Sequence, residues 1–338
     1  MARGGVDVSD VLLEARGLVK HYPVRDGVVI PRLAGHVKAV DGVDLQLRRG
    51  ETLGIVGESG CGKSTLARLL MALERPTEGT ITVLGESLSR LRGRRLRQAR
   101  QHIQMVFQDP FTSLDPRKTV RQILAEPFRV HRDASPRGDR DRQINELIEV
   151  VGLSPDHGDR YPHQFSGGQR QRIGIARALA LKPDILVCDE PVSALDVSVQ
   201  AQVINLLDDL QQEFGLAYVF IAHNLSVVHH IADRVAVMYL GRIVEQGTSQ
   251  EVYDGASHPF SQALLSAAPA PDPTLRDDRD EIVLEGEVPS ALEPPSGCRF
   301  RTRCWKAQDI CAEAEPALVD RGQAHPVACH FAEKVEVV

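Results

Sequence analysis

A glycine-rich loop at residues 57–65 constrains this chain more than any other feature. The loop matches the P-loop pattern G-x-x-x-x-G-K-[ST], follows an apolar strand candidate and precedes a helical run. Backbone amides of such a loop turn inward around phosphate groups, and the following helix adds its dipole. We therefore expect an α/β domain that binds a nucleotide.

Individual P-loop positions have expected roles. Lys63 supplies a positive charge to the β- and γ-phosphates, and the Ser64 hydroxyl can bind Mg²⁺. The thiol at position 61 has no partner base, so we expect it to be inert. The other cofactor-binding candidates in the loop are Gly57, Ser59, Gly60, Cys61, Gly62 and Thr65.

Two acidic residues follow a second apolar strand candidate at residues 185–188. Ligands of open α/β sheets bind beyond the C-terminal ends of the strands. We expect Asp189 to hold Mg²⁺ and Glu190 to orient or deprotonate the attacking water. The pattern is weak alone, and the P-loop makes it a strong indication.

A Ser-Gly-Gly-Gln turn precedes a further helical run. Ser166 suits an N-cap, and Gly167 and Gly168 expose backbone donors before Gln169 at a helix N-terminus. The turn is expected to form a second phosphate-binding surface. Such a turn would be commonplace in a chain without a P-loop.

Strand-like and helical runs alternate from residue 11 to about residue 246, as in an α/β domain with a largely parallel sheet. The strand candidates are residues 52–56, 103–107, 185–188, 218–222, 235–239 and 242–245. About residues 110–180 should form a helical subdomain, with helical stretches at 120–124 and 144–151. Prolines and acidic residues then mark a small irregular extension. The expected domains are an N-terminal tail at 1–10, a nucleotide-binding domain at 11–255 and a C-terminal extension at 256–338.

Composition and charge narrow the function classes. The chain has 338 residues, and its net charge of -6 leaves no basic excess for nucleic acid. The arginine run between Arg90 and Arg100 lacks aromatic residues for base stacking, so a solvated helix face is expected. No stretch approaches the ~18 apolar residues of a membrane span, and Met1 to Asp10 lacks the order of a signal peptide. A cytoplasmic location is expected.

Four of the six cysteines lie after residue 297. Without an export signal, clustered thiols in a reducing compartment favour a shared metal over disulfides. Their spacing lacks the short knuckle of most structural zinc sites, and from the residues alone both zinc and a 4Fe-4S cluster stay open. The candidate ligands are Cys298, Cys304, Cys311 and Cys329.

The chain resembles ABC-type ATPases in the order of its motifs: the P-loop, the Ser-Gly-Gly-Gln turn, the apolar strand that ends in two acidic residues, and a later strand that ends at His223. The resemblance implies a head-to-tail dimer, with each ATP between the P-loop of one subunit and the Ser-Gly-Gly-Gln turn of the other. It further implies that Gln108 contacts Mg²⁺ and the membrane partner, that His223 contacts the γ-phosphate, and that Asp196 communicates across the dimer. Tyr22 would be the aromatic platform for adenine. Phe165 and Asn224 depart from the usual Leu and Asp.

The C-terminal extension resembles that of ATP-binding subunits of oligopeptide and dipeptide ABC importers, notably in Pro294 to Cys298 and Phe300 to Cys304. Some such extensions carry a 4Fe-4S cluster, which the resemblance therefore favours here. It implies an ATPase coupled to transport that lies peripherally on the cytoplasmic face of the membrane. The implied partners are a second related ATPase subunit, two integral membrane permeases and an extracytoplasmic binding protein.

Two alternatives remain. The same machinery could import nickel or another small solute, since subunits outside this chain choose the cargo. An ABC-type ATPase acting on DNA or the ribosome is disfavoured, because the sequence shows no long coiled-coil insertion, zinc-knuckle pair or second nucleotide domain. The ATP site and the cysteine cluster are expected to act independently, as parts of different domains.

Overall fold

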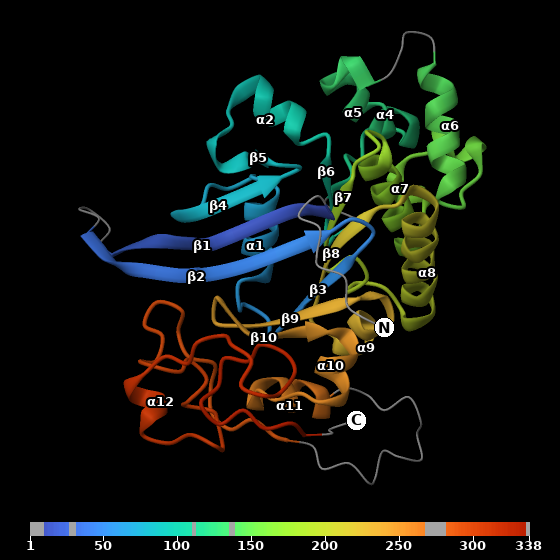
Figure 1. The fold of residues 1–338 in the computed structure, drawn as a ribbon. Helices are drawn as coiled ribbons and strands as arrows, with labels where there is room; N and C mark the ends of the chain where they lie inside the picture. The colour runs from blue at the N-terminus through green and yellow to red at the C-terminus, as the bar shows by residue number, and fades with distance from the viewer. Residues whose placement is uncertain (1–9, 27–31, 110–112, 135–138, 268–281, 336–338) are drawn as a thin grey trace. The chain divides into compact units, whose positions relative to one another are not determined.

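The computed structural model describes residues 10–26, 32–109, 113–134, 139–267 and 282–335 (Figure 1). Most of the expected N-terminal tail and the first residues of the expected helical subdomain, 110–112, lie outside these ranges. The chain divides into two compact units. One comprises Met1–Leu13, Gln46–Glu51 and Thr82–Phe220, and the other comprises Glu14–Leu45, Thr52–Ile81 and Ile221–Val338.

The first unit combines short strands with most of the described helices. Its elements are β5 (Glu86–Ser87), α2 (Gly93–Ala99), β6 (Ile103–Val106), α4 (Val120–Leu124), α5 (Glu126–Val130), α6 (Arg140–Val150), α7 (Gly167–Leu179), β7 (Ile185–Asp189), α8 (Val197–Phe214) and most of β8 (Ala217–Ala222), with 3-10 turns at Leu88–Arg90, Arg132–Ala134, Pro155–Asp159 and Pro162–Gln164.

Burial explains the strands of this unit. Every residue of β7 and β8 is buried, as expected for strands covered on both faces. β6 pairs in parallel with β7, with Ile103 opposite Ile185, and β8 lies on the other side of β7. The expected strands at 103–107, 185–188 and 218–222 are thus confirmed within a residue.

Helices occupy the stretch between β6 and β7, and no strand occurs there among the described residues. Thr119 caps α4 by accepting the Gln122 backbone N–H, and the Gln122 side chain accepts the Thr119 N–H in return. α4 and α6 each pack against α7. The expected helix at 120–124 is confirmed, and α6 begins four residues before the expected residue 144.

The second unit holds the long strands and the C-terminal extension. Its elements are β1 (Val11–Asp26), β2 (Arg32–Arg48), β3 (Thr52–Val56), α1 (Lys63–Leu70), β4 (Glu78–Val83), α9 (Leu225–Ile231), β9 (Arg234–Tyr239), β10 (Arg242–Thr248), α10 (Ser249–Asp254), α11 (Pro259–Ser266) and α12 (Ile310–Glu313), where β1, β2 and β4 each run a few residues into the first unit.

Strand pairing in the second unit begins with β3, which pairs in parallel with β9. β9 then forms a hairpin with β10, and Leu240 and Gly241 make the two-residue turn with φ of 40° and 82°. Positive φ at both central residues is typical of a type I′ turn, whose twist matches the strands it joins. Figure 1 also shows β1 and β2 side by side, two strands that the sequence analysis does not identify.

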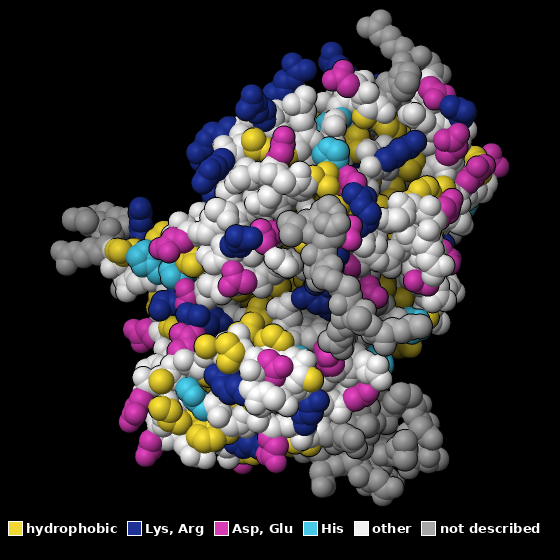
Figure 2. All heavy atoms as spheres, in the orientation of Figure 1, with side chains coloured by type: hydrophobic (Ala, Val, Ile, Leu, Met, Phe, Trp, Pro, Cys, Tyr) yellow, Lys and Arg dark blue, Asp and Glu magenta, His cyan; other side chains and the backbone are white. Residues whose placement is uncertain are grey.

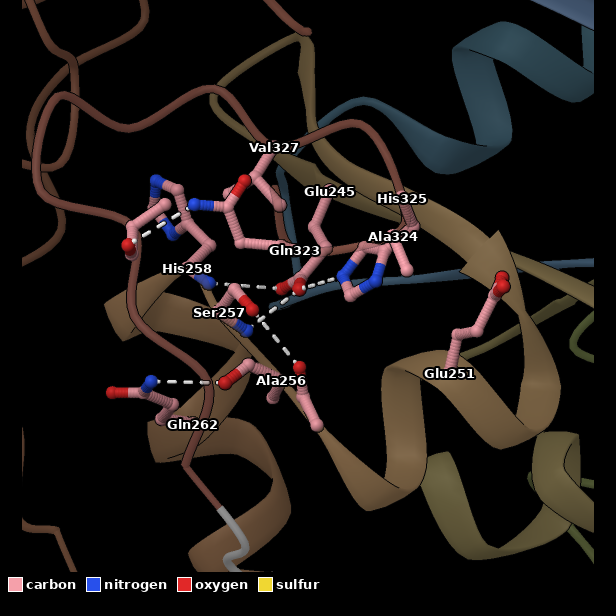
Figure 3. Close-up of polar contacts among 12 residues, drawn as sticks. Glu245, Glu251, Ala256, Ser257, His258, Gln262, Gln323, Ala324, His325 and Val327 are labelled. Carbon is pink, nitrogen blue, oxygen red and sulfur yellow. Dashed lines mark hydrogen bonds and ion pairs between the residues drawn. The ribbon is translucent and has the colours of Figure 1, made fainter. Parts of the chain in front are cut away.

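A buried carboxylate joins the C-terminal extension to β10 (Figure 3). Glu245 is fully buried and accepts the backbone N–H groups of Ser257 at 2.7 Å and His258 at 3.1 Å. The His325 ring, 2% exposed, lies with its Nε2 2.6 Å from the same carboxylate. Backbone bonds on each side, such as Ala328 N–H to Val244 O at 2.7 Å, continue this contact.

Candidate functional site

The P-loop connects β3 to α1 in the second unit, and its backbone requires glycine. Gly60 and Gly62 have φ of 78° and 110°, in the left-handed region. A Cβ at Gly62 would lie 2.0 Å from the Ala39 carbonyl oxygen, and one at Gly57 would lie 2.1 Å from the Met238 carbonyl oxygen. The loop therefore rests directly on neighbouring backbone.

Lys63 is the first residue of α1 and only 4% exposed. Its Nζ donates to the carbonyl oxygens of Gly57 at 2.7 Å and Glu58 at 3.0 Å, so the ammonium is bonded to the first two residues of the loop. Ser59 and Gly60 at the tip are exposed. Burial raises the pKa of the Cys61 thiol, which agrees with the inert role expected for it.

Tyr22, on β1, is close to the start of α1. The pKa of the Tyr22 hydroxyl is raised by burial and by the Glu74 carboxylate, which accepts its hydrogen bond. A weaker contact with Thr65 opposes this rise. The Lys20 ammonium lies 4.9 Å from the ring centroid. One face of the ring is thus already covered by a cation, and only the other could stack on a base.

The acidic pair at the end of β7 lies in the first unit. Asp189 is 5% exposed, the last residue of the strand, and Glu190 has a φ of 46°, a strained conformation for a residue with a Cβ. Gln108 Nε2 donates to Glu190 Oε2 at 2.7 Å. The structure thus brings together Gln108 and Glu190, which lie 82 positions apart in the sequence.

The Ser-Gly-Gly-Gln turn begins α7 as expected. Ser166 Oγ accepts the Gln169 N–H at 3.3 Å, while the Gln169 side chain accepts the Ser166 N–H at 3.1 Å. A Cβ on Gly168 would lie 2.4 Å from Val199 on α8, and one on Gly167 would lie 3.2 Å from Leu195. The small residues therefore allow the turn to pack against the segment that contains Asp196.

The remaining ATP-site candidates also lie at ends of regular elements. Asp196 is exposed at the N-cap position of α8 and makes no side-chain capping bond. His223 is exposed directly after β8, and Asn224 caps α9 by accepting the Ser226 N–H at 2.8 Å. Asn224, which departs from the usual Asp, is thus the N-cap of α9.

All six cysteines are free thiols. Burial, with smaller contributions from the thiols of Cys329, Cys311 and Cys304, raises the pKa of Cys298 to about 11, and the Phe300 backbone N–H partly opposes this rise. The thiols therefore lie near one another. Among the described residues, however, no three His, Cys, Asp or Glu side chains converge closely enough for a single metal ion.

The histidines of the extension have roles in packing and hydrogen bonding. His258 is 1% exposed, and burial lowers its pKa to about 4. Its Nδ1 accepts the Phe260 N–H at 3.1 Å and so caps α11. His325 contacts Glu245, and His330 lies 3.0 Å from the Ala314 carbonyl oxygen.

Arginines of the run between residues 90 and 100 cover α2. Arg92, Arg94, Arg95 and Arg97 are exposed, which confirms the expected solvated face. Figure 2 shows Lys and Arg side chains gathered where Figure 1 places α2.

Comparison with known proteins settles the family. The ABC transporter model matches residues 40–193, and the model of the oligopeptide/dipeptide transporter C-terminal region matches residues 244–311. The oligopeptide transport ATP-binding protein AppF of Bacillus subtilis (strain 168) is 54% identical, over 95% of this chain and 98% of its own length. The chain belongs to the family of ATP-binding subunits of oligopeptide and dipeptide ABC transporters. The dipeptide transport ATP-binding protein DppF of Escherichia coli (strain K12) is 52% identical over 96% of each chain.

Solved structures agree with this family. The ATP-binding cassette MJ0796, solved as a dimer in a post-hydrolysis state with ADP and Pi, has a TM-score of 0.62 and 28% identity over 70% of this chain and 99% of its own. The ABC-type α/β fold and the resemblance to peptide importers are confirmed. The protein is an ABC transporter ATPase that hydrolyses ATP for transport.

Two arginines that the sequence analysis does not identify connect the extension to the P-loop region. Arg303 Nη1 lies 3.1 and 2.8 Å from the two carboxylate oxygens of Glu58. Arg299 donates to the Leu240 carbonyl oxygen and to Asp41. An acidic residue inside a phosphate-binding loop is the one sequence signal that could have suggested a basic partner elsewhere.

Proposed function

We propose that this chain binds and hydrolyses ATP through the residues that its motifs identify. Lys63 and the P-loop amides would bind the β- and γ-phosphates, and Glu190 would orient and deprotonate the attacking water. The observation that carries this proposal is the Gln108–Glu190 contact of 2.7 Å at a strained backbone position. A side chain held in this way is suited to aim at one water molecule.

Oxygen-bearing side chains of this chain fit Mg²⁺. The hydroxyl of Ser64, the amide oxygen of Gln108 and the carboxylate of Asp189 are the hard ligands that Mg²⁺ prefers. When bound, the ion would neutralise charge that develops on the phosphates. His223 would contact the γ-phosphate, and Tyr22 would stack on adenine with the ring face opposite Lys20.

A complete ATP site would need two chains. The chain contains one P-loop and one Ser-Gly-Gly-Gln turn, and both are exposed at their tips. We infer a head-to-tail dimer with a related but distinct ATPase subunit, in which Asp196 communicates across the interface. Ser166→Arg should impair the ATP site formed with the partner's P-loop, while equilibrium binding of ATP to this chain's own P-loop persists. Full hydrolysis by a strictly monomeric chain would refute the composite site.

The cargo is proposed to be a dipeptide or oligopeptide. Relatives that match most of this chain are named oligopeptide and dipeptide transport ATP-binding proteins. Two integral permeases and an extracytoplasmic binding protein would complete the importer, with this subunit on the cytoplasmic membrane face. Among the described residues no helix is long and apolar enough to cross the bilayer.

Uptake distinguishes peptides from the alternative cargo. Cells carrying Lys63→Ala should lose uptake of a labelled dipeptide or tetrapeptide and retain uptake of ⁶³Ni²⁺. The opposite pattern would replace the peptide by nickel, the alternative that the same machinery allows.

For the extension we propose a 4Fe-4S cluster held by Cys298, Cys304, Cys311 and Cys329. Four cysteine thiolates are the usual ligand set of such a cluster. These cysteines lie in the part of the chain that resembles extensions known to carry one. The mutual influence of these thiols on their pKa values supports a shared site.

Anaerobic purification tests the cluster. We expect broad absorbance near ~400 nm and about four irons per chain. Cys311→Ser should bleach the absorbance, whereas Cys188→Ser should leave it unchanged. Stoichiometric zinc without iron would overturn the cluster assignment.

A further inference from the structure

Glu58 is held from both of its ends. Its carboxylate contacts Arg303 Nη1 at 3.1 and 2.8 Å. Its carbonyl oxygen accepts the Lys63 ammonium at 3.0 Å and the Cys61 N–H at 3.3 Å. Any displacement of this residue must therefore move the carbonyl that positions the phosphate-binding lysine.

Arg303 is itself fixed by the extension. Its side chain is 7% exposed, and its backbone N–H donates to the Phe300 carbonyl oxygen at 3.0 Å. The Phe300 ring packs edge-on against Tyr239 at 5.2 Å between centroids. Tyr239 is the last residue of β9, so the segment that contains Arg303 is packed against a strand of the sheet.

The hairpin turn between β9 and β10 is hydrogen-bonded both to the P-loop and to the segment that contains Arg303. Gly241 N–H donates to the Cys61 carbonyl oxygen at 2.8 Å, and Arg299 donates to the Leu240 carbonyl oxygen. The loop, the turn and the Arg299–Arg303 segment thus form one hydrogen-bonded assembly within the second unit.

Charge gives the contact its consequence. The carboxylate of Glu58 belongs to the loop that would receive the triphosphate, so an uncompensated negative charge there would repel the ligand. Arg303 neutralises this charge through a contact with both carboxylate oxygens that is largely withdrawn from water.

We propose that Arg303 is a positioning residue for ATP binding, which orients the P-loop and cancels the Glu58 charge from the C-terminal extension. The proposal rests on the proposed role of the P-loop. It makes nucleotide affinity depend on a segment that lies 245 residues away in the sequence and directly precedes the cluster candidate Cys304.

Equilibrium binding of ATP to the full-length chain tests the proposal. Arg303→Met, which keeps most of the side-chain volume, should raise the Kd about tenfold, the loss of one charge-assisted contact. In the assembled complex KM should rise similarly, while kcat at saturating ATP changes less than about twofold. Arg303→Lys should restore most of the affinity.

A double variant separates electrostatics from folding. Glu58→Gln added to Arg303→Met should recover affinity, because it removes the unpaired carboxylate. Arg301→Met is the matched control, since the side chain of Arg301 bonds only to Ser296 among the described residues. Unchanged affinity in Arg303→Met, equal losses in the Arg301 variant, or no recovery in the double variant would overturn the proposal.

Lys63→Ala shows which idea fails. If this variant still binds ATP normally, the proposed P-loop role itself is wrong. If Lys63→Ala loses binding while Arg303→Met keeps it, only the positioning role of Arg303 is wrong.

Discussion

Replacing the buried Glu245 by Gln should detach the C-terminal extension locally from β10. The Glu245 carboxylate accepts three N–H groups, at 2.7, 3.1 and 2.6 Å, and is fully buried. A glutamine presents an NH₂ group in place of one oxygen, so at least one donor then faces another donor. The remaining bonds also lose their charge assistance.

The expected cost is about 3–5 kcal/mol, since one charged bond is lost and the others weaken toward neutral strength. A change of that size should speed amide exchange of Ser257 and His258 by about 100-fold or more, if local opening limits the exchange. Hydrogen exchange with mass spectrometry, on peptides covering residues 256–262 and 325–335, measures this directly.

The control is Glu313→Gln, at an exposed position on α12 in the same extension. Exchange in this variant should stay within about twofold of the parent. Unaltered exchange in Glu245→Gln, or equal acceleration in both variants, would refute the reasoning from the buried carboxylate.

Three further outcomes are expected. Burial lowers the pKa of His258 to about 4, so the folded state holds this ring in its neutral form. The resulting contribution to the free energy of unfolding is complete above the unfolded pKa of ~6.5 and falls by about 3 kcal/mol as the pH drops to 4. Urea unfolding at a series of pH values should show this loss, and His258→Asn should reduce it. Gly62→Ala should weaken ATP binding more than tenfold (about 1.4 kcal/mol or more), whereas Gly174→Ala, where a Cβ meets nothing within 4 Å, should leave the affinity unchanged. Equal ATP affinities of the two variants, measured by calorimetry, would contradict the requirement for glycine at position 62. Cys188, whose burial raises its pKa to about 12, should resist iodoacetamide at pH 8 in native protein, and rapid alkylation seen by mass spectrometry would contradict its burial.

Local sequence signals predicted the motifs and the strands that carry them. Apolar runs flanked by glycine or acidic residues locate β3, β7 and β8, because a strand buried on both faces has few other compositions. The Ser166 cap follows from its spacing to Gln169 alone.

Long-range contacts could not be predicted in this way. β1 and β2 mix polar and apolar residues, so no continuous apolar run identifies them. The Arg303–Glu58 pair joins segments that share no local pattern, and the expected independence of the extension from the ATP site did not anticipate it. Only the folded chain shows such pairs.

Hydrolysis by Glu190→Gln tests the central claim most directly. With the transport complex assembled, the variant should bind ATP with the affinity of the parent and hydrolyse it about 10²–10⁴ times more slowly, because the amide cannot accept the proton of the attacking water. ATP should then accumulate unhydrolysed on a closed dimer, measured as bound ATP after gel filtration. Turnover at the parent's rate in this variant would contradict the account.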